Sequence, residues 1–107
     1  MDWKYEEGRV YWVDENNELM AEATFVIKDD GEVDIDHTFV NPSLRGQGVA
    51  GKMMEALAEH LREKGKKASA SCSYAKNWLK KRREAYSDII SDRFDDDTMA
   101  CKIDGKH

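Results

Sequence analysis

The chain has 107 residues, of which 40% are hydrophobic and 36% are charged, a composition typical of a single globular domain. Its formal net charge of −5 argues against general binding of nucleic acid, and no apolar run approaches the length of a membrane span. Since the first residues begin no apolar signal segment, we expect a cytoplasmic protein. We also expect it to act as a monomer. Cys72 and Cys101 fit no metal-binding spacing and are expected to be free thiols.

Three stretches in the first part of the chain have the pattern of β-strands. Residues 9–13 are β-branched and aromatic, and residues 19–27 and 32–40 alternate between apolar and polar side chains. Asp29-Asp30-Gly31 is typical of a hairpin turn, so we expect an antiparallel meander of three strands. In the third strand the alternation would place four side chains on one face: Val33, Ile35, His37 and Phe39.

A glycine-rich turn, residues 41–52, joins the third strand to a helix-like run. It holds Pro42 and three glycines, Gly46, Gly48 and Gly51. Glycines let a backbone turn tightly and approach a ligand, and the first turn of a helix has amide N–H groups without internal partners. The turn therefore predicts an anion site, usually for phosphate, with an ordinary strand–turn–helix connection as the alternative.

Two known phosphate-binding patterns match the turn only in part. The spacing Gly46-x-Gly48-x-x-Gly51 is that of dinucleotide-binding loops, but residues 66–71, where such a loop needs an acid, contain none. The spacing Gly46-x-x-x-x-Gly51-Lys52 is that of the phosphate loop of nucleoside triphosphatases. There Met53 occupies the position of the Ser or Thr whose hydroxyl holds magnesium.

After the turn, Val49, Met53, Leu57 and Leu61 recur every four residues, which predicts an amphipathic helix that stops at Gly65. Next comes a run of small residues, 67–73, that we interpret as a strand because a strand–helix–strand crossover needs one. Its small side chains would leave room for a ligand against the sheet, or would form a loosely packed edge strand.

A second helix is predicted over residues 74–86, with Ser73 as its N-cap. Its apolar face would consist of Ala75, Trp78, Leu79 and Tyr86. The apolar pattern fades from Ser87, and residues 91–107 are expected to form a loosely attached tail.

This order of elements and three short motifs resemble the GNAT superfamily of acetyl-CoA-dependent N-acetyltransferases, in particular its small single-domain branch. The motifs are Asp36-His37-Thr38-x-Val40 in the third strand, Pro42-x-x-Arg45-Gly46-Gln47-Gly48-x-Ala50 in the turn, and Ser71-Cys72-Ser73-Tyr74 before the second helix. The resemblance implies an α/β fold with a mixed sheet: an antiparallel three-strand meander, then a helix, a parallel strand and a second helix. It implies one domain over residues 1–107.

The resemblance also implies how acetyl-CoA would bind. The amides of the turn would hold the pyrophosphate, and the pantetheine arm would lie between the third strand and the small-residue strand, pairing like an added strand. The residues implied in binding are Thr38, Phe39, Val40, Arg45, Gly46, Gln47, Gly48, Val49, Ala50, Gly51 and Cys72. Lys76 or Lys80 would meet the 3′-phosphate of coenzyme A, the alternative being a solvated helix face.

Three side chains are candidates for the chemistry of acetyl transfer. His37 could deprotonate the amine, but on an apolar face a satisfied core histidine is the alternative. Tyr74 could protonate the leaving thiolate, as a tyrosine often does in GNAT enzymes, or could simply cover the core. Cys72 could accept the acetyl group as a nucleophile, or line the cleft as a small buried side chain.

The leading interpretation is an N-acetyltransferase that moves the acetyl group of acetyl-CoA to an unidentified amine, on a small molecule or a protein. Direct attack by the amine is preferred over transfer through Cys72. A non-catalytic coenzyme A-binding or regulatory interaction module is the alternative, because the acceptor-binding elements of larger GNAT enzymes have no counterpart here. A nucleoside triphosphate-binding domain is disfavoured by Met53.

Overall fold

Five strands and two helices make up the computed structural model, which describes residues 2–92 and 94. The elements, in chain order, are β1 (Lys4–Glu6), β2 (Arg9–Val13), β3 (Leu19–Ile27), β4 (Val33–Val40), a 3₁₀ turn η1 (Pro42–Leu44), α1 (Val49–Lys64), β5 (Ala68–Ala70) and α2 (Ser73–Lys81). Neither helix of the described part is long and apolar enough to cross a bilayer.

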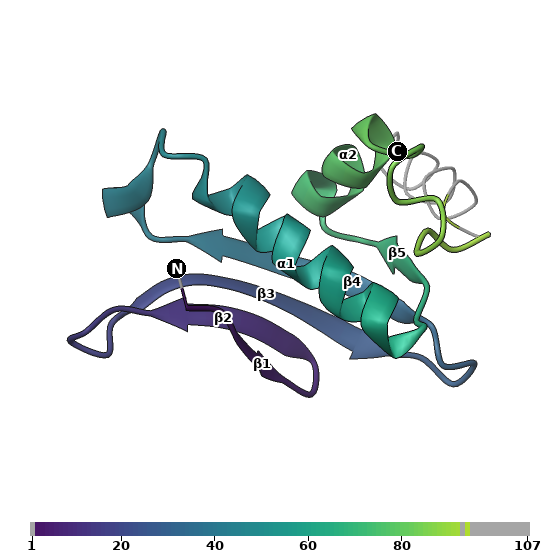
Figure 1. Ribbon diagram of the computed structural model, residues 1–107, viewed down its shortest axis with the longest axis horizontal. Coiled ribbons are helices and arrows are strands. Elements are labelled where there is room, and N and C mark those ends of the chain that lie inside the picture. Colours follow the sequence, from purple (N-terminus) through teal and green to yellow (C-terminus); the bar gives the residue numbers. More distant parts are fainter. Residues whose placement is uncertain (1, 93, 95–107) are drawn as a thin grey trace, which may run out of the picture.

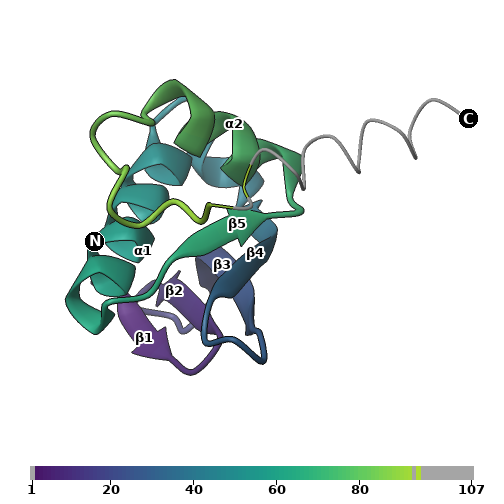
Figure 2. The same ribbon diagram turned by 90° about the vertical axis from the view of Figure 1, so that its right-hand side faces the viewer.

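The strands form one mixed sheet in the order β1-β2-β3-β4-β5, antiparallel from β1 to β4 and parallel between β4 and β5. This confirms the predicted α/β sheet and adds β1, a short exposed strand that sequence patterning missed. The sheet is curved, and α1 lies across its hollow side (Figures 1 and 2). α2 follows β5 and contacts α1, β4 and β5.

α1 forms because its residues favour helices and because four-residue spacing gives it one continuous apolar face. Its predicted stripe is confirmed, with Val49, Met53, Leu57 and Leu61 all buried against the sheet. Each such side chain contributes about 1.5–3 kcal/mol on transfer from water. The helix ends as predicted at Gly65, whose φ of 67° is left-handed and whose N–H bonds the Arg62 carbonyl at 3.1 Å.

The predicted alternation of β4 breaks at Asp36. The register pairs Thr24 with His37 and Phe25 with Ile35, so one residue of β4 is left without a partner on β3, as in a β-bulge. The extra residue turns the following side chains to the other face of the sheet. Ile35 is buried while His37 is exposed, and the prediction that the two share an apolar face is therefore wrong.

Beyond the bulge, Thr38 and Val40 point to the side of the sheet that α1 covers. They pair with Ala23 and Ala21, both fully buried, and paired residues share a face. Phe39 points to the opposite side, where it pairs with Glu22.

β5 is shorter than predicted but is no loose edge strand, since Ala68, Ser69 and Ala70 are all fully buried. The chain returns along its outer edge after α2. The Ala68 N–H bonds the Ile89 carbonyl at 2.6 Å, and the Ser91 N–H bonds the Ala68 carbonyl at 2.8 Å. These bonds cover polar groups that an edge strand would otherwise expose.

α2 differs from its prediction at both ends. Its N-cap is Cys72 rather than Ser73, and it ends at Lys81, short of the predicted Tyr86. Ala75, Trp78 and Leu79 are buried as predicted, and the Tyr86 ring lies 5.2 Å from that of Trp78. Within the predicted tail, Ser91 and Phe94 are buried, while residues 93 and 95–107 lie outside the described part of the chain.

Candidate functional site

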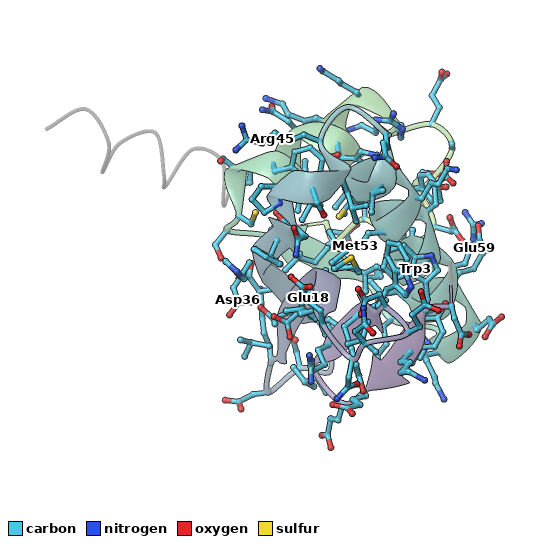
Figure 3. The ribbon with its side chains drawn as sticks, turned by 90° about the vertical axis from the view of Figure 1, so that its left-hand side faces the viewer. Trp3, Glu18, Asp36, Arg45, Met53 and Glu59 are labelled. Atoms are coloured by element: carbon cyan, nitrogen blue, oxygen red, sulfur yellow. The ribbon has the colours of Figure 1, made fainter. Side chains whose placement is uncertain are left out.

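The glycine-rich turn is anchored to the sheet through Asn41. Its side-chain amide donates to the Leu19 carbonyl and to a Glu18 carboxylate oxygen, both at 3.2 Å, and its oxygen accepts from the Ser43 N–H at 3.0 Å. These bonds fix where the chain leaves β4. Arg45 follows in an extended conformation with its side chain at the surface (Figure 3).

Two glycines then turn the backbone into α1. Gly46 has a φ of 79° and Gly48, the N-cap of α1, a φ of 72°, both in the left-handed region that favours glycine. A Cβ added to either glycine would meet no atom of the described residues within 4 Å, so the turn has an open outer surface. A ligand can therefore approach the backbone here.

The N-terminus of α1 is uncapped in the part of the chain that the structure describes. No side chain there makes a cap hydrogen bond, and the first turn contains no acidic residue. The first intrahelical bond is that of the Lys52 N–H to the Gly48 carbonyl, so the amides of Gly48 to Gly51 have no acceptor among the described residues and can bind an anion. The Arg45 and Gln47 amides are already bonded, to the Pro42 and Leu44 carbonyls. The helix dipole adds a positive potential at the same place. Phosphate is the anion that such a site suits best.

β4 and β5 part beside this site. They pair only through Val33, Asp34 and Ile35, and the Ile35 carbonyl then accepts the Ser71 and Cys72 amides, both at 3.1 Å. The Asn41 N–H bonds the Met20 carbonyl of β3. Because alternate residues of a strand face the same neighbour, the backbone groups of Thr38 and Val40 point away from β3, toward the side on which β5 lies. This is where the sequence predicts the pantetheine arm.

The side chains of Thr38 and Cys72 meet across the place where the strands part. The Thr38 Oγ1 lies 3.4 Å from the Cys72 Sγ, and both side chains are half-buried. Cys72 is the N-cap of α2, and Ser71 before it donates a hydrogen bond of 2.6 Å to the Asp34 carboxylate. Of the candidate chemical residues, Cys72 is thus the one that faces the predicted cofactor path.

The other two candidates are not brought to Cys72 by a contact among the described residues. His37 is exposed on the face of the sheet that α1 does not cover, and the bulge at Asp36 is what turns it there. It is therefore no core histidine. Tyr74 lies in the first turn of α2 with 40% of its surface exposed, so it does not cover the core either.

The basic side chains in and after α2 lie in different environments. Lys76 is half-buried, and its Nζ is inaccessible to solvent and lies 5.9 Å from the centre of the Phe94 ring. Lys80 is exposed, as the solvated-face interpretation expects. Arg82 lies over the Trp78 ring at 4.4 Å. Of the two lysines considered for the 3′-phosphate, Lys80 is the accessible one in this conformation.

Sequence reasoning missed two features of the site. The bulge residue Asp36 accepts a 2.6 Å hydrogen bond from the Thr24 hydroxyl, which holds the distorted strand in place. The Trp78 Nε1 is buried without an acceptor among the described residues, and a Cβ on Gly51 would lie 3.8 Å from it. In the sequence, the only sign of the bulge is that the polar His37 interrupts the apolar residues at alternate positions. Because the next such position is the apolar Phe39, the alternation seems to continue.

A comparison with protein families agrees with this geometry. The model of the GCN5-related N-acetyl-transferase family matches residues 9–89, which include the sheet from β2 onward, the turn and both helices. The chain belongs to this family. Enzymes of the family use acetyl-CoA, and by its family this chain is an N-acetyltransferase.

Solved structures give the same result. A GCN5-like protein from Staphylococcus aureus is 41% identical, with a TM-score of 0.69 over 84% of this chain and 87% of that chain. The ribosomal-protein-S18-alanine N-acetyltransferase of Escherichia coli is 18% identical, with a TM-score of 0.56 over 73% of this chain. The match spans 53% of the E. coli chain, about half its length, and shows the fold alone.

Proposed function

We propose that this protein transfers the acetyl group of acetyl-CoA to the nitrogen of an amine, as one domain. The observation that carries the proposal is the uncapped N-terminus of α1, which opens from a two-glycine turn at the place where β4 and β5 part. The free end of α1 suits a phosphate, and β4 leads from the gap beside β5 into the turn that precedes this helix end. Few ligands other than coenzyme A combine a pyrophosphate with an extended amide-containing arm.

The turn fits the pyrophosphate by chemistry and by space. The amides of Gly46 and of Gly48 to Gly51 have no acceptor among the described residues, and the two left-handed glycines leave their outer side open. Arg45 is exposed next to these amides and can add a cation to the same anion.

The gap between the strands fits the pantetheine arm. The backbone groups of Thr38 and Val40 face the gap, so they can pair with the amides of the arm as an added strand would. Ala70, the last residue of β5, and the half-buried Cys72 border the same gap. The arm would therefore end near the Thr38 and Cys72 side chains.

In the reaction a C–N bond to the acceptor forms and the thioester C–S bond breaks, while the amine loses a proton and the sulfur of coenzyme A gains one. His37 remains our candidate for the base and Tyr74 for the acid. We favour direct attack by the amine, with Cys72 bordering the acetyl group. In the covalent alternative the Cys72 sulfur would carry the acetyl group between the two steps.

The proposal is tested with two matched glycine variants. Gly48 and Gly65 stand at opposite ends of α1 with φ values of 72° and 67°, and a Cβ added to either would lie more than 4 Å from any described residue. Replacing either with Ala strains the backbone similarly, but only Gly48 belongs to the turn. We expect calorimetry to show acetyl-CoA binding weakened about tenfold or more by Gly48→Ala and unchanged by Gly65→Ala.

Two results would count against the proposal. If the wild-type protein shows no acetyl-CoA binding, acetyl transfer from this donor is wrong. If Gly48→Ala and Gly65→Ala bind equally well, the cofactor is held elsewhere. ATP and NAD serve as ligand controls, since the first two phosphate-binding patterns of the turn would favour them.

A further inference from the structure

A second hollow lies at the other end of α1. It has a volume of about 330 Å³ and is enclosed by β1, the ends of β3 and β4 that meet at their hairpin, and the last turns of α1. Buried side chains of Phe25, Val33 and Leu61 line it. Since α1 has 16 residues and rises about 1.5 Å per residue, roughly 24 Å separates this end from the glycine-rich turn. The hollow is therefore separate from the proposed acetyl-CoA site.

The mouth of the hollow is apolar and aromatic. Tyr5 and Ile27 line it with 47% and 44% of their surfaces exposed, so apolar surface is accessible to a ligand there. The Tyr5 ring stacks on the His60 imidazole at 4.7 Å with an angle of 20° between the planes. Burial, and secondly the charge of Lys64, lower the pKa of His60, so this wall is uncharged at neutral pH. A flat apolar group suits these surroundings.

The charges around the hollow favour an anion. Lys64 and Lys66 line it, and neither has an ion pair with any residue that the structure describes. Glu6 is already bound, since it accepts hydrogen bonds from the Tyr11 hydroxyl at 2.9 Å and from Arg9 at 3.4 Å. In the β1–β2 register Glu6 shares a face with Arg9, opposite to the face of Tyr5. Of the charged residues that line the hollow, this leaves one carboxylate, that of Glu7, to balance the two positive charges of Lys64 and Lys66.

We propose that this hollow binds a small aromatic carboxylic acid. The ring would lie against Tyr5, His60 and Ile27, and the carboxylate would meet Lys64 and Lys66. The volume falls within the lower part of the range of small-molecule pockets, enough for one or two fused rings. Such a ligand would touch both the β1–β2 hairpin and the end of α1, and would leave the glycine-rich turn open.

The proposal is tested by NMR titration with 1-naphthoate and its neutral isostere 1-naphthamide. We expect saturable shifts of the Gly8 and Leu61 amides with naphthoate, and binding about fivefold weaker with the amide. The double variant Lys64→Gln/Lys66→Gln should weaken naphthoate binding by a similar factor. Lys67→Gln, an exposed lysine that does not line the hollow, should have no effect.

Three outcomes would overturn the proposal. The first is the absence of saturable shifts at millimolar naphthoate. The second is shifts confined to residues 45–51, which would place the anion in the glycine-rich turn. The third is equal affinity for naphthoate and naphthamide, which would remove the role of the lysines. Acetyl-CoA binding, measured in the same double variant, should be unchanged.

Discussion

Asp36 shows how one residue decides which groups can take part in chemistry. As the extra residue of β4 it reverses the pleat, so that His37 is exposed on one face while Thr38 reaches Cys72 on the other. The Thr24 hydroxyl holds the Asp36 carboxylate at 2.6 Å. If His37 acts as a base, it must receive the amine from the face of the sheet that α1 does not cover.

His60 gives a prediction about pH. Its pKa in the folded protein is lowered, first by burial and then by Lys64, whereas in the unfolded chain it returns to about 6.5. As the pH falls through this value, the unfolded chain binds a proton before the folded protein does, and stability decreases. We expect the thermal midpoint to fall less between pH 7 and 5 in His60→Gln than in the wild type.

Melting curves followed by circular dichroism check this prediction. Measurements at pH 8, where the imidazole is neutral in both states, give the effect of the substitution itself. If the thermal midpoints of the two proteins fall by the same amount between pH 7 and 5, protonation of His60 is not linked to folding.

At the scale of elements, Arg62 ties α1 to the segment that follows α2. Its guanidinium bonds both oxygens of Asp88, at 2.6 and 2.9 Å, and the Ala85 carbonyl at 3.0 Å. The bond to Arg62 lowers the pKa of Asp88. Stability from this pair is therefore present above the unfolded pKa of about 3.9 and is lost as the pH falls through the lower folded value.

Asp88→Asn should accordingly lower the melting temperature at pH 7, and the difference from the wild type should shrink in acid. High salt should also reduce the difference, because both side chains are exposed. Glu84→Gln, at an exposed acid on the same segment, is the matched control. A difference that is independent of pH and salt would assign the effect of Asp88 to packing instead.

The elements that the sequence predicted correctly are those specified by neighbouring residues. The stripe of α1, its stop at Gly65 and the Asp29-Asp30-Gly31 hairpin depend on contacts within a few positions. The turn at Gly46 and Gly48 was also predictable from neighbouring residues, because positive φ angles favour glycine and the glycines are visible in the sequence.

The features that were missed depend on distant parts of the chain. The backbone groups of Ile89 and Ser91 bond Ala68 at the edge of β5, a pairing that no local sequence pattern indicates. β1 is exposed throughout, so it has no apolar face to detect. The contact between the Thr38 and Cys72 side chains also joins segments far apart in sequence, and no spacing in the sequence predicted it.

At the scale of the whole molecule, the proposed cofactor path lies between two parts of the fold. One side consists of β4, the glycine-rich turn and the start of α1, and the other of β5 and the start of α2. The two sides pair only through Val33, Asp34 and Ile35 before they part. A ligand that binds between them should therefore stabilise both sides together, by mass action on the folded state.

Hydrogen exchange with and without acetyl-CoA tests this arrangement within one strand. The amides of Thr38 and Val40 face the gap, so a pantetheine arm that pairs with them should slow their exchange. The amides of His37 and Phe39 face β3 and should change little, which makes them internal controls. Residues 49–51, at the free end of α1, should be protected by the pyrophosphate. Protection of residues 49–51 alone, with Thr38 and Val40 unchanged, would place the pantetheine arm outside the sheet and leave Cys72 without a role.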